Sequence, residues 1–557
     1  MTKISAEAIE LLRYLLKNKT FFSENYFTAS TISARNHVKV GDLEPLLKEL
    51  VKEHVLFTRK DFLRAQRYLL DVEAGENFLA EINEEETIYT QEYREALEDE
   101  VKKYKKFIIT TAVMGKDVNK PFADAIRNYA KRNNALMLVL PCEDVVSRGK
   151  KAKVLELSPE LDDFKVVFKD MYLNDNLYLC AIKVSAKQIN PLTGLDRVPV
   201  KKGASIIIAS PKVFLKYIPN IHYDIPPALM TTGAITVNNY DTERYMSKRT
   251  STLAENDHTY GAVIVEVENK NIFHFRHVQA SSYNSITDMG IDYLPDGTVK
   301  QMEESAMVMG DSHVGYHDLE LHEEVMEVAS RAHVKEVILH DIFHGSSISH
   351  HDAKKGVTNA IKAKEGRLGL ERECVAVMKY LMDITDHGFQ ISIVSESNHD
   401  QHLLKYLEDG RYISDPINYQ FSLKLAYAAT EGNNPLRYAL EEELGYKDNK
   451  VVWLEEDVSH RVYGVECGSH GSRGSNGSRG SLAQFEKAYG NCVTGHTHSA
   501  AILRNAFAVG TVGLMDMKYN KGLSSWTRTC CLIYKNGTKQ LINFIPDEKG
   551  DYKYTLV

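Results

Sequence analysis

The stretch Ala306-Met307-Val308-Met309-Gly310-Asp311-Ser312-His313 joins a short apolar run to a carboxylate and an imidazole. Short apolar runs bounded by small residues predict buried parallel strands. The runs 336–339, 391–394 and 491–493 are likewise followed by Asp, His or Asn side chains. Open α/β sheets place their sites at the carboxyl ends of strands. We therefore predict an α/β fold with a functional site where these strands end.

The polar residues after the strands, together with a His in Gly468-Ser469-His470-Gly471, form a candidate metal-ligand set. A mixture of carboxylate, imidazole and one amide suits borderline divalent metals, whereas an all-oxygen Mg or Ca cage needs fewer His. Seven ligands are too many for one ion and fit two ions that share a carboxylate. We expect two divalent ions, with Mn favoured and Mg, Fe or Zn as alternatives. The candidate ligands are Asp311, His313, Asp341, Asn398, His470, His496 and His498.

These motifs, in this order, resemble those of the calcineurin-like metallophosphoesterases over roughly the last 250 residues. The resemblance implies a two-sheet sandwich flanked by helices. It also implies a role for each residue. Asp311, His313 and His498 would bind the first metal, Asp341 would bridge both metals, Asn398, His470 and His496 would bind the second, and His399 would protonate the leaving oxygen.

The chain departs from the family pattern at two places. The family usually has Gly-Asp at the bridging carboxylate and Gly-Asn-His at the amide ligand. This sequence has His340-Asp341 and Ser397-Asn398-His399 instead. Because these glycines are replaced, we expect the backbone turns at the two positions to differ from those of the family, while the set of ligands is unchanged.

The run 341–349, Asp-Ile-Phe-His-Gly-Ser-Ser-Ile-Ser, resembles the double-strand-break repair nuclease branch of this family. In that branch His344 would shape the nuclease site from beside the ligands. The whole architecture also resembles early-expressed proteins of large lytic coliphages that degrade host DNA. The resemblance implies DNA as the partner and the host cytoplasm as the location.

The composition of the 557 residues, with 43% hydrophobic and 26% charged, is that of a folded protein with more than one domain. No stretch reaches the ~20 apolar residues of a membrane helix, and no signal-peptide pattern is present, so no membrane partner is expected. Seven Cys without CxxC pairs indicate reduced thiols in a cytoplasm. The net charge is −8, but residues 71–100 carry −11, which leaves +3 for the remainder. Global charge therefore neither supports nor excludes nucleic-acid binding.

Residues 1–70 have helical periodicity and then a strand, which resembles a winged helix-turn-helix domain. Arg35, Lys39, Arg59 and Lys60 could contact DNA phosphates, but a winged helix used for protein packing explains the sequence equally well. Residues 71–106, with their many acidic side chains, predict a helical linker.

Residues 107–305 predict a separate α/β domain that begins with a strand, a helix over 121–133 and a second strand over 135–140. No catalytic motif occurs in it, so a scaffold or assembly role and a homo-oligomer are expected. Residues 306–557 form the predicted catalytic domain. Its tail, with a hairpin at Asn536-Gly537, is expected to complete the second sheet of the sandwich.

Two basic segments are candidates for substrate binding. Lys354 and Lys355 begin a basic stretch that extends to Arg367 and could follow a phosphate backbone, although a solvated helix face is favoured there. The stretch 468–481 is rich in Gly and Ser and carries Arg473 and Arg479. Gly allows close approach of backbone N–H groups to phosphate, so a phosphate-binding loop is favoured over a plain linker.

The site predicts a metal-dependent DNA nuclease that hydrolyses phosphodiester bonds by a two-metal mechanism, with His399 and His344 as catalytic residues. A nucleotide or protein phosphatase or phosphodiesterase with the same ligands is the first alternative. A DNA-binding regulatory or assembly protein with a structural metal site is the second. The presence of His399 argues against the last one, because a structural site needs no proton donor.

Overall fold

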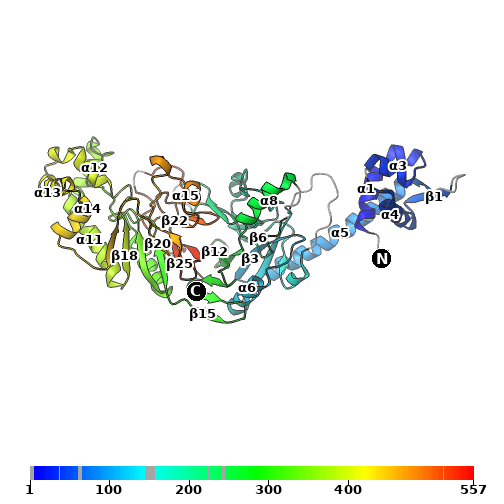
Figure 1. Cartoon of the computed structure of the whole chain (residues 1–557), viewed down its shortest axis with the longest axis horizontal. Helices are drawn as coiled ribbons and strands as arrows, with labels where there is room; N and C mark the ends of the chain where they lie inside the picture. Colours follow the sequence, from blue (N-terminus) through cyan, green and yellow to red (C-terminus); the bar gives the residue numbers. More distant parts are fainter. Residues whose placement is uncertain are drawn as a thin grey trace. The chain divides into compact units, whose positions relative to one another are not determined.

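The computed structural model describes residues 5–36, 38–60, 66–144, 157–221, 225–240, 245–517 and 520–556. The chain divides into two compact units, of which the first ends at Glu100 and the second begins at Val101. Helices and several mixed sheets make it a mixed α/β protein, as expected from the sequence (Figure 1). None of the helices within these ranges has the length and apolar character needed to span a lipid bilayer.

The first unit consists of short helices, an antiparallel hairpin and a long helix. An apolar cluster that includes Leu12, Phe22 and Leu47 fills the space between the short helices and the hairpin. The order of helices followed by a hairpin agrees with the winged-helix prediction, of which residues 1–4, 37 and 61–65 lie outside the described ranges. The elements are α1 Ala6–Lys17, α2 Lys19–Glu24, α3 Ala29–Asn36, α4 Val40–Lys52, β1 Leu56–Lys60, β2 Gln66–Leu70 and α5 Val72–Val101.

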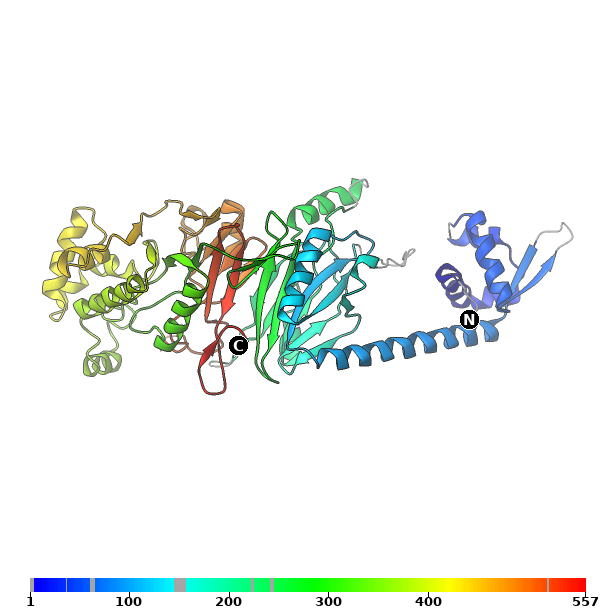
Figure 2. The same cartoon turned by 90° about the horizontal axis from the view of Figure 1, so that it is seen from below.

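The predicted acidic linker is helical, because α5 runs as one continuous helix (Figure 2). The four predicted DNA-contacting side chains of the first unit, Arg35, Lys39, Arg59 and Lys60, are all exposed. The Arg35 guanidinium also lies 3.7 Å from the centre of the Phe21 ring. Their contact with DNA stays a prediction.

The second unit begins with a five-stranded sheet in the order β12-β11-β3-β4-β5. Strand β3 (Lys106–Val113), helix α6 (Lys120–Asn133) and strand β4 (Ala135–Cys142) form the predicted unit, with the two strands parallel. Asn119 caps the amino end of α6, because its side chain accepts the Phe122 N–H. The other strands of this sheet are β5 Lys165–Val166, β11 Gly261–Val267 and β12 Phe273–Gln279.

A six-stranded sheet in the order β19-β18-β17-β16-β25-β26 contains three of the strands first recognised in the sequence. Strands β16 to β19 are parallel, and β25 pairs with β16 in the antiparallel sense. The hairpin at Asn536-Gly537 connects β25 to β26 as predicted. However, the tail extends the sheet of β16 and does not join the second sheet, which corrects the expectation. The strands are β16 Ser305–Val308, β17 Val334–Leu339, β18 Gln390–Val394, β19 Val451–Leu454, β25 Thr529–Tyr534 and β26 Lys539–Asn543.

A ten-stranded sheet combines segments from far apart in the chain. Strand β23 pairs with β9, which joins residues around 502 to residues around 215. The sheet therefore crosses the predicted domain boundary at residue 305. Its strands are β6 Met171–Asn174, β7 Leu177–Cys180, β8 Ser205–Ile208, β9 Phe214–Tyr217, β10 Ala228–Thr231, β20 Arg461–Val462, β21 Val465–Glu466, β22 Cys492–Thr494, β23 Ala501–Leu503 and β24 Ala506–Ala508.

Further helices and two small sheets complete the second unit. The helices are α7 Arg197–Lys202, α8 Tyr245–Asp257, α9 Leu319–Arg331, α10 Gly356–Lys364, α11 Leu370–Asp386, α12 His402–Glu408, α13 Tyr419–Thr430, α14 Pro435–Tyr438 and α15 Leu482–Tyr489. The small sheets contain β13 Ile286–Asp288, β14 Ile291–Tyr293 and β15 Val299–Gln301, and β27 Ile545–Pro546 with β28 Tyr552–Lys553.

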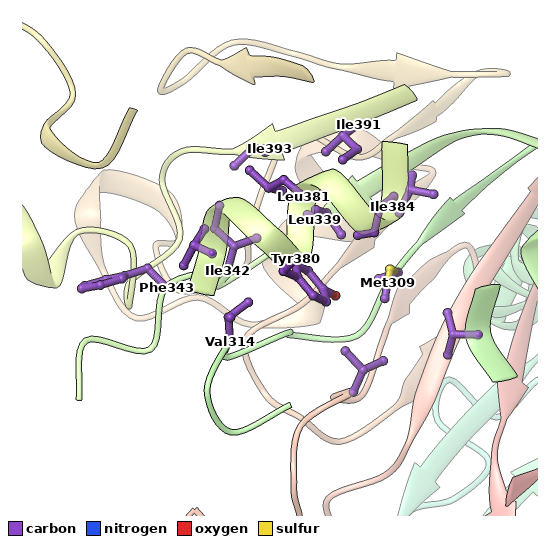
Figure 3. Close-up of a cluster of buried hydrophobic side chains, with 14 of the residues drawn as sticks. Met309, Val314, Leu339, Ile342, Phe343, Tyr380, Leu381, Ile384, Ile391 and Ile393 are labelled. Carbon is purple, nitrogen blue, oxygen red and sulfur yellow. The ribbon is translucent and has the colours of Figure 1, made fainter. Parts of the chain in front are cut away.

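An apolar core packs α11 against the six-stranded sheet (Figure 3). Leu381 and Ile384 of α11 lie against the buried side chains of β17 and β18, and each such buried aliphatic side chain contributes about 1.5–3 kcal/mol. The core continues into the segments that follow β16 and β17 through Val314 and Phe343. The Tyr380 hydroxyl donates to Ser312 Oγ at 3.0 Å. The core therefore supports the segments that carry the candidate ligands.

A buried ion network ties the five-stranded sheet to the C-terminal region. Arg276 on β12 is 2% exposed and makes two hydrogen bonds to Asp288, at 2.7 and 3.0 Å. It also donates to Glu266 at 3.3 Å and to the Tyr554 carbonyl at 3.1 Å. Burial raises the pKa of Glu266, but Arg276 outweighs it and holds the pKa at about 2. Gln540 of β26 donates to Asp288 as well.

We expect Arg276→Met to destabilise the second unit by ~3–5 kcal/mol, because the buried Asp288 carboxylate loses the cation that pairs with it and Glu266 keeps only Lys106. The measurement is the urea midpoint followed by tryptophan fluorescence, since both tryptophans, Trp453 and Trp526, lie in this unit. The matched control is Arg331→Met, which removes an arginine that is 59% exposed and should cost less than about 1 kcal/mol. Equal midpoints for the two variants would contradict the role of the network.

Candidate metal centre

The candidate ligands lie in the segments that follow the carboxyl ends of strands. Asp311 and His313 follow β16, Asp341 follows β17 and Asn398 follows β18. The remaining ones, His470, His496 and His498, follow β21 and β22 of the ten-stranded sheet. The site thus forms where the ends of strands from two different sheets meet.

A first group of donor atoms comes from Asp311, His313, Asp341 and His498. One atom of each lies within 4.8 Å of the atoms of the others, and all four side chains are buried. The Nε2 atoms of His313 and His498 face each other at 2.9 Å, and His498 Nε2 lies 3.1 Å from Asp311 Oδ2. Asp311 Oδ1 is buried without a hydrogen-bond partner among the described residues. This buried cluster can hold a metal ion.

A second group surrounds Asn398. Its Oδ1 lies 2.8 Å from both His470 Nε2 and His496 Nδ1. His470 Nε2 is also 3.4 Å from Asp341 Oδ2, so Asp341 touches both groups. The structure therefore brings the seven side chains predicted as ligands close together, as two adjoining groups, and their binding of metal stays a prediction.

The backbone adopts the left-handed conformation at four of these ligands. The φ angles are 47° at His313, 44° at Asp341, 75° at His496 and 53° at His498. Such positions cost on the order of 1 kcal/mol for a residue with a side chain, and they gather at functional sites. By contrast, His340 and Ser397 do not have positive φ. These two residues stand where the calcineurin-like family, which the sequence resembles, has glycines. The turns at these two positions therefore do not need the conformational freedom of glycine.

Backbone N–H groups hold the two carboxylates in place. The His496 N–H donates to Asp311 Oδ2 at 2.9 Å, and the His399 N–H donates to Asp341 Oδ1 at 2.9 Å. The His313 N–H donates to the Asp341 carbonyl at 2.7 Å. At Gly495 a Cβ atom would overlap with Asp311 Oδ1, so glycine permits this close approach.

Burial and neighbouring charges set the protonation states. Burial lowers the pKa of His313 well below its usual value, and the adjacent histidines lower it further. Burial raises the pKa of Asp341, but His470 and His399 outweigh it and hold the pKa low. For His470, burial lowers the pKa, but the Asp341 carboxylate raises it to about 9. Ionised carboxylates and neutral imidazoles bind metals, so a cation would compete with the proton on His470.

The two predicted catalytic histidines lie beside the first group. His399 Nδ1 donates to the His344 carbonyl at 2.9 Å, because a carbonyl can only accept, and this leaves Nε2 free to exchange a proton. The His399 ring centre is 4.5 Å from that of His313. His344 Nδ1 lies 3.3 Å from His313 Nδ1, and its ring packs 4.3 Å from Tyr316. Donor atoms of His313, His344 and His399 also lie within 4.8 Å of one another, so this trio is an alternative metal group.

The Gly- and Ser-rich loop forms a compact turn next to His470. Arg473 and Arg479 lie opposite each other in an antiparallel bridge. Arg473 is held by Glu456 and Gln401, whereas the exposed Arg479 guanidinium has no partner among the residues that the structure describes. The loop also walls a cavity of about 460 Å³.

The basic segment after His344 is only partly available to a substrate. Lys354 and Lys355 are exposed, and Lys355 pairs with Asp352 at 3.1 Å. Lys362, farther along the same segment, is buried and donates to the Ser346 carbonyl and to Asp352. The prediction that this stretch offers a solvent-exposed basic surface is therefore wrong at Lys362. This side chain instead stabilises the segment between Ser346 and Asp352.

Three further residues contact the site, and no role was predicted for them from the sequence. Asp400 Oδ1 accepts the Phe343 N–H at 2.7 Å, and Glu396 Oε1 accepts the His470 N–H at 3.1 Å, so both fix ligand-bearing segments. The His402 ring lies 4.6 Å from that of His399. Their position on either side of Asn398 was the available signal.

Comparison with known proteins gives one relative. The chain is 29% identical over 472 residues to protein A1 of Escherichia phage T5, an alignment that covers 80% of this chain and 83% of that protein. This similarity supports a phage origin and a phage-related function. No protein-family model and no solved structure matches the chain.

We expect Gly495→Ala to weaken metal binding by ~10- to 100-fold, because the added methyl group displaces the Asp311 carboxylate. Bound metal would be measured by mass spectrometry after dialysis against graded Mn concentrations. The control is Gly356→Ala, since Gly356 has open space around its Cβ position and no positive φ. Unchanged affinity in Gly495→Ala would mean that Asp311 is not a ligand.

Proposed function

We propose that this protein is a metal-dependent DNA nuclease that hydrolyses phosphodiester bonds with two divalent ions. The observation that carries the proposal is the position of Asp341, whose carboxylate lies between the two donor groups while His399 stands beside them. A carboxylate that can bind two ions at once suits two-metal phosphoryl chemistry, which needs the ions close together. In an infected cell such an enzyme would degrade host DNA.

Asp311, His313, Asp341 and His498 would hold one ion, and Asp341, Asn398, His470 and His496 the other. Mn suits these ligands, and Mg, Fe or Zn are alternatives. Bound ions would activate a water molecule and neutralise charge on the phosphoryl oxygens. The unpartnered Asp311 Oδ1 and the facing imidazole nitrogens of His313 and His498 fit a cation.

His399 is suited to move the proton at the leaving group. Its Nδ1–H bond to the His344 carbonyl fixes the ring, and one of its ring nitrogens lies within 4.8 Å of donor atoms of His313 and His344. It is only half-buried, whereas His313 and His470 are buried, so a substrate can reach it. The His344 ring packs between Tyr316 and His313, and the His344 carbonyl accepts the hydrogen bond from His399. His344 thus helps to position the imidazoles of His313 and His399. Its role is therefore one of positioning, with His399 as the proton donor.

Three observations support DNA as the substrate. The run 341–349 resembles the repair-nuclease branch, and the relative in phage T5 supports a phage-related role. Arg479 offers an exposed guanidinium on a loop that begins at His470, and guanidinium groups bind phosphate with two parallel hydrogen bonds.

A phosphodiesterase or phosphatase for nucleotides is the second candidate. The cavity of about 460 Å³ includes Glu396 and Ser469, which neighbour the ligands Asn398 and His470. A cavity of this size suits a small molecule and not a duplex. The two candidates share every ligand and differ only in the surface that receives the substrate.

We expect the metal-stripped protein to degrade linear or circular duplex DNA when Mn or Mg is restored. His399→Ala should lower the rate by ~10²- to 10⁴-fold and retain metal, because it removes only the proton donor. Asp341→Ala should lose both activity and metal. The control is His387→Ala, a histidine at the end of α11 that contacts Asp383.

Full activity of His399→Ala would contradict its role as proton donor. Intact DNA combined with cleavage of p-nitrophenyl phosphate or its bis-ester would favour the second candidate over the nuclease. A circular substrate that survives while the linear one is lost would identify an exonuclease.

We expect Arg479→Ala to weaken DNA binding and to reduce the slope of log affinity against log salt by about 1, because one phosphate contact is lost. Binding would be measured by fluorescence anisotropy at several salt concentrations, with EDTA present to prevent cleavage. The control is Arg437→Ala, which removes an exposed arginine of α14 that pairs with Glu441. An unchanged slope would exclude Arg479 from the binding surface.

A further inference from the structure

A second polar cavity, of about 240 Å³, lies where β12, β22 and the β25–β26 hairpin come together. Its lining includes Gln279, Ser281, Asn491, Asn505, Asn536 and Lys539, and none of its lining residues is acidic. It adjoins the amino end of β22, whereas His496 and His498 follow the carboxyl end of the same strand. The cavity is therefore distinct from the candidate metal centre.

Lys539 is the single charged residue of this cavity. It is 4% exposed, and its ammonium donates to Asn491 Oδ1 and, at 2.7 Å, to the Asn505 carbonyl. It also lies 4.4 Å from the centre of the Phe507 ring. No carboxylate of the described residues forms an ion pair with it, although buried charges are ordinarily paired.

Hydrogen-bond donors face this cavity without enough acceptors to match them. Gln279 Nε2 is buried and has no partner in the part of the chain that the structure describes. Asn491 uses its Oδ1 for Lys539, so its amide N–H groups remain available. An ammonium and two amides that converge on one space are complementary to an oxyanion.

We propose that this cavity binds a small phosphorylated molecule with its phosphate group against Lys539. The volume is about eight times that of one water molecule in the liquid, which exceeds the need of a phosphate ion and leaves room for an attached sugar. Thr538 lines the same space, and its hydroxyl, which donates to Asn536 Oδ1, can still accept a hydrogen bond from a hydroxyl group of the ligand.

The charge of Lys539 is consistent with this ligand. Burial lowers its pKa to about 8, while the neighbouring thiols of Cys531, Cys492 and Cys467 act in the opposite direction. The ammonium form therefore persists at neutral pH. A bound phosphate would supply the anion that the chain itself does not provide.

The test is calorimetric titration of the full-length protein, in EDTA, with inorganic phosphate, dAMP and deoxyadenosine. We expect the two phosphorylated probes to bind and deoxyadenosine not to bind. Tighter binding of dAMP than of phosphate would identify a nucleotide as the ligand class, and equal binding would identify the phosphate group alone. Failure of both phosphorylated probes to bind would overturn the proposal.

Two variants assign the binding to this cavity. Lys539→Met removes the cation, and Asn491→Asp keeps the size of the side chain but places a carboxylate on the ammonium. Each should weaken phosphate binding at least ten-fold. Asn491→Asp should also raise the Tm measured without phosphate, which verifies that it is folded even if Lys539→Met is not. Unchanged phosphate binding in Asn491→Asp would place the anion elsewhere and overturn the proposal.

Discussion

The buried carboxylate of Asp341 is the constraint on which the candidate site depends. A carboxylate taken out of water is stable only if opposite charge or hydrogen-bond donors surround it. The chain supplies the His399 N–H, at 2.9 Å from Oδ1, and His470, at 3.4 Å from Oδ2. It also holds Asp341 at a φ of 44°, a backbone conformation that residues other than glycine adopt infrequently. The Ser397 hydroxyl, which accepts the Asp341 N–H, secures that conformation.

The site cannot form from one segment, because each sheet supplies only part of it. The six-stranded sheet positions Asp311, Asp341 and Asn398, and the ten-stranded sheet positions His470, His496 and His498. The His496 N–H bond to Asp311 closes this junction across 185 residues of sequence. Non-local pairing of this kind pays its loop-closure entropy before the contacts form. The donor groups are therefore a product of the packing between the sheets, and a change at that junction would act on the site even without touching a ligand.

The sequence was sufficient to predict the strands 306–309, 336–339 and 391–394 and the side chains that follow them, because short apolar runs and strand-end ligands are local signals. It could not predict which sheet the tail joins, since the pairing of β25 with β16 depends on contacts far along the chain. The left-handed φ angles at the ligands could not be predicted either, because Asp and His adopt this conformation more often than most residues but far more often occur outside it. Lys362 was misjudged for a related reason. A lysine is usually solvent-exposed, so the sequence predicts an exposed side chain. Only the fold shows that the Lys362 ammonium is buried and donates to the Ser346 carbonyl and to Asp352.

Buried charges of opposite sign stand at the two ends of β22. At its carboxyl end the carboxylates of Asp311 and Asp341 share a space with imidazoles, which are weak partners unless protonated. At its amino end the Lys539 ammonium is met only by amide and carbonyl oxygens and by an aromatic ring. No carboxylate of the described residues offsets the Lys539 ammonium, whereas the Asp341 carboxylate is offset by His470, whose pKa of about 9 keeps a proton on its imidazole. A cation that displaces this proton at one end, and an anion beside Lys539 at the other, would each stabilise the folded chain. The same short strand would then be stabilised by both ions, so the stability of its two ends would depend on the ions in solution.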